Sequence, residues 1–210
     1  MDVEQVKSPK SKITGASGSR LGEIVESSSS QYTAQCYKLE EAPPLGSLVK
    51  TREKAFDVYG VVYNVVTHSL EPGRRVIARG EKLETEAEIF AANPQLTRLL
   101  ATDFSVLVVG YVEGKHQHQF LPPKSSSIHG FVHICQRDEI SAFTQSLDFL
   151  SLLLNARISL PVDEVVAACV RQCSSVHDQP DAFLIKAGKE LTRMLSGDVN
   201  RLNSLLKRLK

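Results

Sequence analysis

Four of the six histidines lie close together, in the stretch KHQHQFLPPKSSSIHGFVHIC between Lys115 and Cys135. They are His116, His118, His129 and His133. The first two are two residues apart and the last two are four apart, so on extended strands each pair would share a face. Because imidazole is a common zinc ligand, the four side chains could hold a metal ion if the two pairs met in space.

The residues around these histidines favour another interpretation. Structural zinc sites of a reducing compartment usually include several cysteines, and catalytic ones usually carry an ordered motif such as His-Glu-x-x-His. The sequence contains neither pattern here. We therefore interpret the four histidines as an exposed rim where the chain leaves a barrel. In this interpretation Ile128–Cys135 is a connecting strand that leads toward helices, and we predict no cofactor.

The four cysteines form no Cys-x-x-Cys motif. Cys169 and Cys173 would share one helix face, as a metal or redox pair would, but free cysteine more often serves as a small buried hydrophobe. Cys36 or Cys135 beside a histidine would be a candidate nucleophile, although a fold of this size supplies such pairs by chance. Since Gly-x-Ser-x-Gly is also absent, we predict no catalytic residue and no enzymatic activity.

One short basic stretch is a candidate site for phosphate. The sequence LEPGRRVIARG places three arginines beside glycines, namely Arg74, Arg75 and Arg79. The alternative is a turn with a solvated basic side, which we prefer. Neither a Gly-x-x-x-x-Gly-Lys-Ser/Thr motif nor a Gly-x-Gly-x-x-Gly motif occurs.

The C-terminal end is a second candidate binding element. Between Lys186 and Lys210 seven Lys or Arg residues, Lys207 and Arg208 among them, stand against Glu190 and Asp198. An amphipathic basic helix can dock on a membrane, an acidic partner or RNA. However, the accompanying leucine stripe has to be buried, so we expect it to pack on the preceding helices while the cations stay solvated.

The composition excludes several classes of protein. The 210 residues carry 25 Lys or Arg against 24 Asp or Glu, which gives a net charge of +1 and no global field for nucleic acid or an anionic membrane. The N-terminal residues do not have the apolar core of a secretory signal, and no apolar run has the length of a membrane span. We therefore expect a cytoplasmic protein, or one from a comparable reducing compartment.

The pattern along the chain predicts an α+β fold. Residues 1–19 are polar and are expected to form a disordered tail. Residues 20–135 predict strands, among them the short Ser47–Thr51. Ala55–Leu70 is the most β-branched of these strands, and Gly60 within it suggests a bulge. Residues 81–102 predict a helical insert that Asn93-Pro94 divides, and residues 136–210 predict a C-terminal helical region. Short strands interrupted once predict a closed or nearly closed antiparallel β-barrel of about six strands.

These segments resemble a known family. RLGEIVESSSSQYTAQCYKLEEAPPLGSLVKT, followed by FDVYGVVYNV, resembles the HAS-barrel, the small barrel named for the HerA helicase and ATP synthase. FLPPKSSSIHGFVHIC resembles the Pro-Pro rim and the strand that follow such barrels. The chain from Arg20 onward is similar to stand-alone HAS-barrel proteins of cyanobacterial type, through PQLTRLL, LDFLSLLL, PVDEVVAA and LIKAGKEL.

The resemblance implies a function for the barrel. In the helicase and synthase the barrel precedes a RecA-like motor that supplies the Walker motifs, and this sequence has no such motor. For this sequence the resemblance implies packing against neighbouring subunits or a partner protein. We therefore expect a non-enzymatic interaction or assembly module. The alternative is an accessory subunit of a ring ATPase or a nucleic-acid-processing complex, with Arg74, Arg75, Arg79 and the basic C-terminus as contacts. A histidine-dependent metalloprotein is a third hypothesis.

Overall fold

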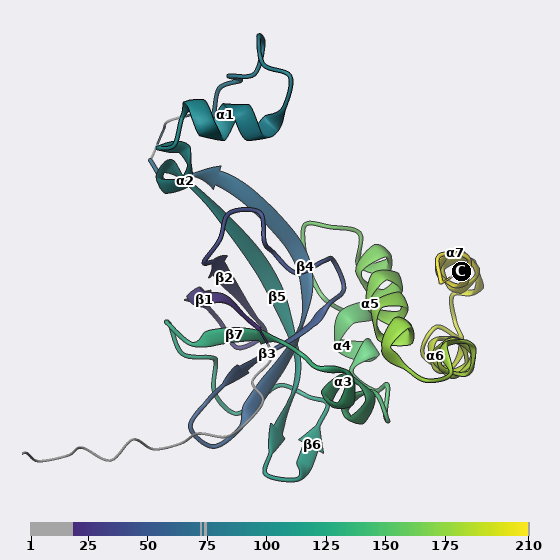
Figure 1. Ribbon diagram of the computed structural model, residues 1–210. Coiled ribbons are helices and arrows are strands. Elements are labelled where there is room, and N and C mark those ends of the chain that lie inside the picture. Colours follow the sequence, from purple (N-terminus) through teal and green to yellow (C-terminus); the bar gives the residue numbers. More distant parts are fainter. Residues whose placement is uncertain (1–18, 72, 74, 210) are drawn as a thin grey trace, which may run out of the picture.

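The computed structural model describes residues 19–71, 73 and 75–209, and it confirms an α+β fold with a barrel followed by helices (Figure 1). The predicted tail lies outside the described residues except for its last position. The strands are β1 (Arg20–Ser27), β2 (Gln31–Cys36), β3 (Leu48–Arg52), β4 (Asp57–Ser69), β5 (Leu100–Glu113), β6 (His116–His118) and β7 (Phe131–Ile134).

Six of these strands close into an antiparallel barrel, as predicted. The neighbours around the ring are β1, β7, β3, β4, β5 and β2, and β2 pairs with β1 to complete it. The remaining strand, β6, forms a short hairpin with β5. Closure gives both edges of a strand a partner, so within the ring few backbone groups are left without hydrogen bonds.

The barrel interior is filled by alternate residues of its strands. In β3, for example, Val49 points inward and Leu48 belongs to the outer cluster. The interior cluster consists of Ile24, Tyr32, Ala34, Val49, Phe56, Val58, Val62, Phe104, Val106, Val108 and Val132. Gly60 lies at a register shift between β4 and β5, which confirms the predicted bulge. A Cβ atom there would come within 2.3 Å of Val106 Cγ1, so only glycine fits.

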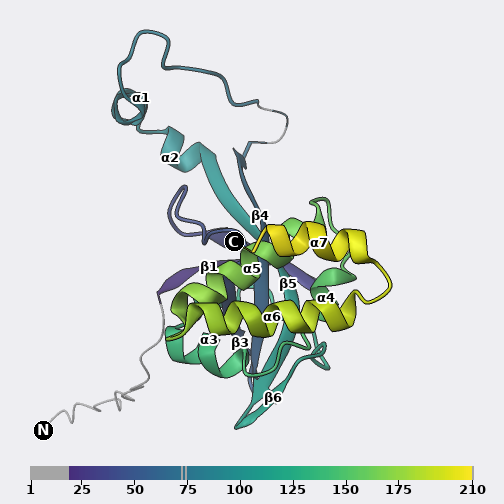
Figure 2. The same ribbon diagram turned by 90° about the vertical axis from the view of Figure 1, so that its right-hand side faces the viewer.

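Seven helices complete the described part of the chain. They are α1 (Glu86–Ala92), α2 (Leu96–Leu99), α3 (Arg137–Phe143), α4 (Leu150–Leu154), α5 (Val162–Val176), α6 (Pro180–Met194) and α7 (Val199–Lys207). The last five cover one outer side of the barrel (Figures 1 and 2). None of the helices in the described part has both the length and the apolar character of a membrane span.

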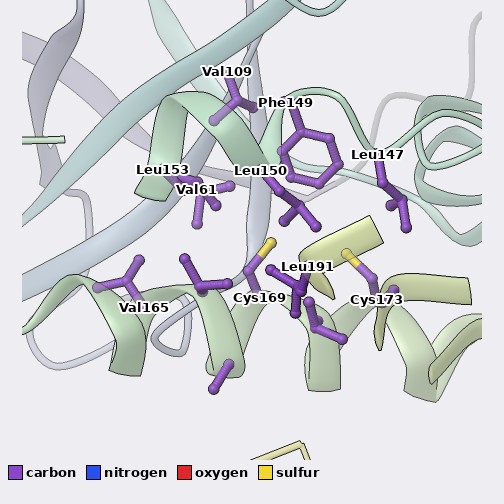
Figure 3. Packing of buried hydrophobic residues seen from close by; sticks show 14 of the residues in the cluster. Val61, Val109, Leu147, Phe149, Leu150, Leu153, Val165, Cys169, Cys173 and Leu191 are labelled. Carbon is purple, nitrogen blue, oxygen red and sulfur yellow. The ribbon is translucent and has the colours of Figure 1, made fainter. Parts of the chain in front are cut away.

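A second hydrophobic cluster joins the helices to the outside of the barrel. Figure 3 shows Val61 and Val109 from the strands facing α4, beneath which Cys169 and Cys173 of α5 lie close to Leu191 of α6. The barrel and the C-terminal helices therefore share one core on this side.

Two predicted elements differ from the structure. Within the predicted helical region the apolar residues from Arg137 to Asn155 keep helical spacing throughout, but the chain turns between α3 and α4. There the Ser146 hydroxyl oxygen accepts from the backbone N–H of Asp148 at 3.4 Å, and such a local side-chain-to-backbone bond competes with the helix. The connecting strand predicted at Ile128–Cys135 is instead a member of the barrel, because β7 pairs with both β1 and β3.

The helical insert forms the tip of an arm. The end of β4 and the start of β5 continue beyond the barrel and carry α1 and α2 (Figures 1 and 2). The predicted division near Asn93-Pro94 is confirmed, because Asn93 ends α1 and α2 begins at Leu96. Both helices are shorter than predicted, since residues 81–85 form turns and residues 100–102 belong to β5.

Candidate functional site

The structure places the two histidine pairs on opposite sides of the barrel. His116 and His118 lie on β6, which is attached to β5, whereas His133 lies within β7 and His129 just before it. In either direction around the ring, two strands separate β5 from β7. Over residues 19–71, 73 and 75–209, no group of three or more His, Cys, Asp or Glu side chains is arranged to hold a metal ion.

Two of these histidines make local contacts on their own side of the barrel. The ring of His118 stacks on Tyr111, with 4.6 Å between the centroids. The Nδ1 atom of His129 lies 3.2 Å from Glu23 Oε1. The four residues therefore do not form one site.

Cys169 and Cys173 are packing residues, as expected. Cys135, Cys169 and Cys173 are buried free thiols, and Cys36 is half-buried. Burial, reinforced by Asp103 and Glu41, raises the pKa of the Cys36 thiol to about 11. Burial likewise raises the pKa of Cys135 well above the usual value. Thiols with such raised pKa values stay protonated at neutral pH and are poor nucleophiles.

The cationic candidates fall into two separate groups. Arg75 and Arg79 are exposed at the tip of the arm, and Arg74 lies outside the described residues. Lys207 and Arg208 belong to the end of α7, on the helical side of the barrel (Figure 2). The two groups do not form one basic patch.

The basic C-terminal helix packs as predicted. Leu202, Leu205 and Leu209 are buried against the preceding helices. The Arg208 guanidinium donates to Glu164 Oε1 at 2.6 Å and also to Ser204. The leucine stripe is thus part of the core, and Arg208 is already paired within the chain.

The tip of the arm contains an apolar hollow. Its volume is about 520 Å³, and it lies between α1, α2 and the segment that precedes them. Its lining residues are Glu40, Ser69, Arg75, Val76, Ile77, Ala78, Arg79, Glu86, Ile89, Phe90, Leu96, Leu99 and Leu100. Most of the lining is apolar, and arginine and glutamate side chains of both signs stand among it.

Apolar side chains around this hollow remain in solvent. Val76 is 55% exposed and Ile77 is 64% exposed. Neither α1 nor α2 contains a buried residue. The tip therefore belongs to neither of the two hydrophobic clusters.

A polar network holds the arm at the barrel. Asp103 of β5 accepts a hydrogen bond from the Gln35 amide at 3.1 Å and from His68 Nε2 at 2.9 Å. On the other face, the Thr102 hydroxyl oxygen accepts from the backbone N–H of Glu40 at 2.9 Å. These bonds tie both strands of the arm to β2 and to the loop that follows it.

The sequence predicts the arginines of this site but not its apolar residues. Val76 and Ile77 stand between arginines in a segment with no predicted strand partner, which is a signal of exposed apolar surface. Ile89 and Phe90 have ordinary helical spacing, and spacing alone does not show whether a helix face is covered.

Neither a family model nor a curated protein matches this sequence. The closed barrel is a property of the structure, and the resemblance to the HAS-barrel stays a prediction from the residues.

Proposed function

We propose that the protein is a non-enzymatic interaction module, and that the tip of the arm is where it binds a partner protein. The observation that carries the proposal is that α1 and α2 bury no residue although their apolar side chains line a hollow of about 520 Å³. A partner that fills this hollow would supply the burial that the tip lacks.

Helix length supports this proposal. Helix α1 has 7 residues and α2 has 4. Isolated helices shorter than about 12 residues are marginal in water, and most helical stability in proteins comes from packing of an apolar face. A partner that covers Ile89, Phe90 and Leu96 would stabilise both helices.

The distribution of exposed apolar residues supports it as well. Among the described residues, four exposed large hydrophobic side chains fall between Leu70 and Leu83. They are Leu70, Val76, Ile77 and Leu83. Contiguous exposed apolar surface on a folded protein usually marks an interaction site.

The rim of the hollow indicates the chemistry of the partner. Arg75 and Arg79 line the hollow, and so do Glu40 and Glu86. A protein surface with an apolar centre and charges of both signs around it would match this rim. The free thiols fit a reducing compartment such as the cytoplasm.

The tip can be tested with two matched isoleucines. Ile77 at the hollow is 64% exposed, and Ile185 on α6 is 61% exposed but lies away from the arm. We expect Ile77→Asp to reduce recovery of a stoichiometric partner from native extract by about tenfold or more, because a charge in an apolar contact is costly. Ile185→Asp should leave recovery unchanged. The measurement is quantitative mass spectrometry of material captured on each purified protein.

Two results would contradict the proposal. One is equal recovery by Ile77→Asp and the wild-type protein. The other is the absence of any stoichiometric protein on the wild-type chain. Melting curves of both variants show whether each is folded, so that a loss of binding is not confused with unfolding.

A further inference from the structure

Strand β4 has an open edge over its second half. It pairs with β5 from Asp57 to Ser69, whereas its pairing with β3 ends at Val61. The last backbone bonds on the β3 side are those of Val62, which accepts from Gly46 and donates to Ser47. Beyond Val62, no other described residue provides a backbone partner on that side. Residues 64–69 therefore form an edge strand.

This edge lacks the usual features that prevent strands from pairing. Proteins commonly protect open edges with lysine, proline, a bulge or a covering segment. Residues 64–69 read NVVTHS and contain no Lys, Arg, Asp, Glu, Pro or Gly. The register shift between Val62 and Asn64 lies at the start of the segment, and from Asn64 to Ser69 the register with β5 is unbroken.

The side chains of the edge favour pairing with another strand. Val65 is 43% exposed and Val66 is 47% exposed, and Thr67 next to them is β-branched as well. Such residues are the most favourable ones in strands. The segment also has the usual length of a strand, about 5–6 residues.

Charge favours a second copy of the same chain as the partner that pairs with this edge. The only ionisable side chain of the segment is His68, and its Nε2 atom lies 2.9 Å from the carboxylate of Asp103. Two copies therefore meet without unbalanced like charges at the edge, and the net charge of +1 gives little repulsion between whole molecules. Pairing a strand with its own copy about a two-fold axis also closes the assembly at two subunits.

We infer that two copies of this protein pair through residues 64–69 of β4, antiparallel, so that one sheet runs through both arms. This inference goes beyond the proposed function, because it concerns the edge of the arm and a second copy. The tip and its hollow take no part in it.

The test uses two valines of equal exposure. Val65 lies on the open edge and Val25 lies in β1, which pairs with β2 on one side and β7 on the other, and each is 43% exposed. Sedimentation of the wild-type protein at about 100 μM, where complexes of micromolar Kd are populated, should give twice the monomer mass. Val65→Lys should give the monomer mass, and Val25→Lys should match the wild-type protein.

Hydrogen exchange provides a second measurement that needs no variant. In the wild-type protein, backbone amides of residues 64–69 should exchange more slowly at about 100 μM than at about 1 μM, because a paired edge is protected only in the dimer. Amides of β1 should exchange at the same rate at both concentrations.

Several results would overturn the inference. They are a monomeric wild-type protein at about 100 μM, a dimer that Val65→Lys leaves intact, and a dimer that Val25→Lys disrupts equally. Exchange at residues 64–69 that does not depend on concentration would also overturn it. Ile77→Asp should still dimerise, which separates this surface from the proposed partner site.

Discussion

The imidazole of His68 lies between two hydrogen-bond acceptors. Its Nε2 atom is 2.9 Å from Asp103 Oδ2, and its Nδ1 atom is 3.1 Å from the carbonyl oxygen of Ser69. Each nitrogen donates only when it carries a proton, so both bonds form together only in the imidazolium. The bond to Asp103, helped by the one to Ser69, accordingly raises the pKa of His68.

We predict that His68 stabilises the protein more in acid than in alkaline solution. A raised pKa in the folded state gives stability that is fully present below the unfolded value of about 6.5 and is lost as pH rises through the folded value. The stability difference between wild type and His68→Gln should therefore shrink between about pH 6 and pH 9. Since the side chain is partly exposed, the difference should be about 0.2–1 kcal/mol at most, measured by urea unfolding.

His177 provides a control, because its pKa is shifted in the opposite direction to that of His68. Burial, together with the charge of Lys186, lowers the pKa of His177, which lies against Thr144 and stacks on Phe183. Its neutral form is favoured in the folded protein, so its contribution is present above the unfolded value and declines as pH falls through it. The difference between wild type and His177→Gln should thus grow with rising pH. Equal pH slopes for the two variants would contradict at least one of the two assignments.

At the level of elements, one glycine sets how closely the loop after β2 approaches α5. Gly46 has φ +83°, and a Cβ atom there would lie 2.4 Å from the carbonyl carbon of Ala168 and from the Cys169 nitrogen. These are backbone atoms of a packed helix, which do not move aside easily. The loop in turn bonds to Val62 of β4 and holds the barrel against the helix.

We expect Gly46→Ala to destabilise the protein by about 2–4 kcal/mol, from the left-handed conformation and the steric clash together. Gly114 is the control, because its φ is +60° and no atom lies within 4 Å of the added Cβ. Gly114→Ala should cost only about 1–2 kcal/mol, the conformational part. Denaturant unfolding measures both values. Equal destabilisation by the two substitutions would show that the close contact with α5 adds nothing to the cost of Gly46→Ala.

Most strands could be predicted from the sequence because their alternation is clear. Val49 and Thr51 point into the barrel while Leu48 and Lys50 point out, and period-two patterns of this kind are visible in one sequence. The turn between α3 and α4 could not be predicted, because Phe143, Leu147 and Leu150 keep helical spacing across it and all three are buried. The role of β7 depends on pairing with β1, more than a hundred residues earlier, and spacing carries no information about such pairing.

The candidate site was predictable in part for a similar reason. Arg75 and Arg79 stand out by type, and the structure does place them at the tip. The open edge of β4 is indicated less clearly by the sequence than the arginines are. The one indication is that the predicted strand Ala55–Leu70 is much longer than its predicted neighbour Ser47–Thr51. Whether Phe90 is covered depends on what lies opposite it in space, which no local pattern encodes.

At the level of the whole molecule, the tip contributes little to the two hydrophobic clusters. None of the described residues between Leu70 and Leu99 is buried, and β4 and β5 pair along the arm as far as Ser69↔Leu100. The two strands of the arm are therefore held in register without the helices.

We predict that replacing residues 71–98 with Asn-Gly leaves the barrel folded. This dipeptide favours the tight turn that joins two antiparallel strands, and no cluster residue is removed. The melting temperature should change by less than about 4 °C, and capture of the partner should be abolished. Calorimetry and the capture assay measure the two effects. A fall of more than about 10 °C would show that the tip is a structural part of the barrel.

Barrel closure also has a consequence for synthesis of the chain. Strand β7 pairs with β1 and β3, as in Arg20↔His133 and Val49↔Ile134, so both earlier strands lack a neighbour until residue 134 has been made. A nascent chain that emerges from the ribosome must hold β1 and β3 with open edges over most of its translation. Contacts this distant in sequence slow folding and expose such edges to mispairing. The nascent chain is therefore expected to need chaperone protection until β7 emerges.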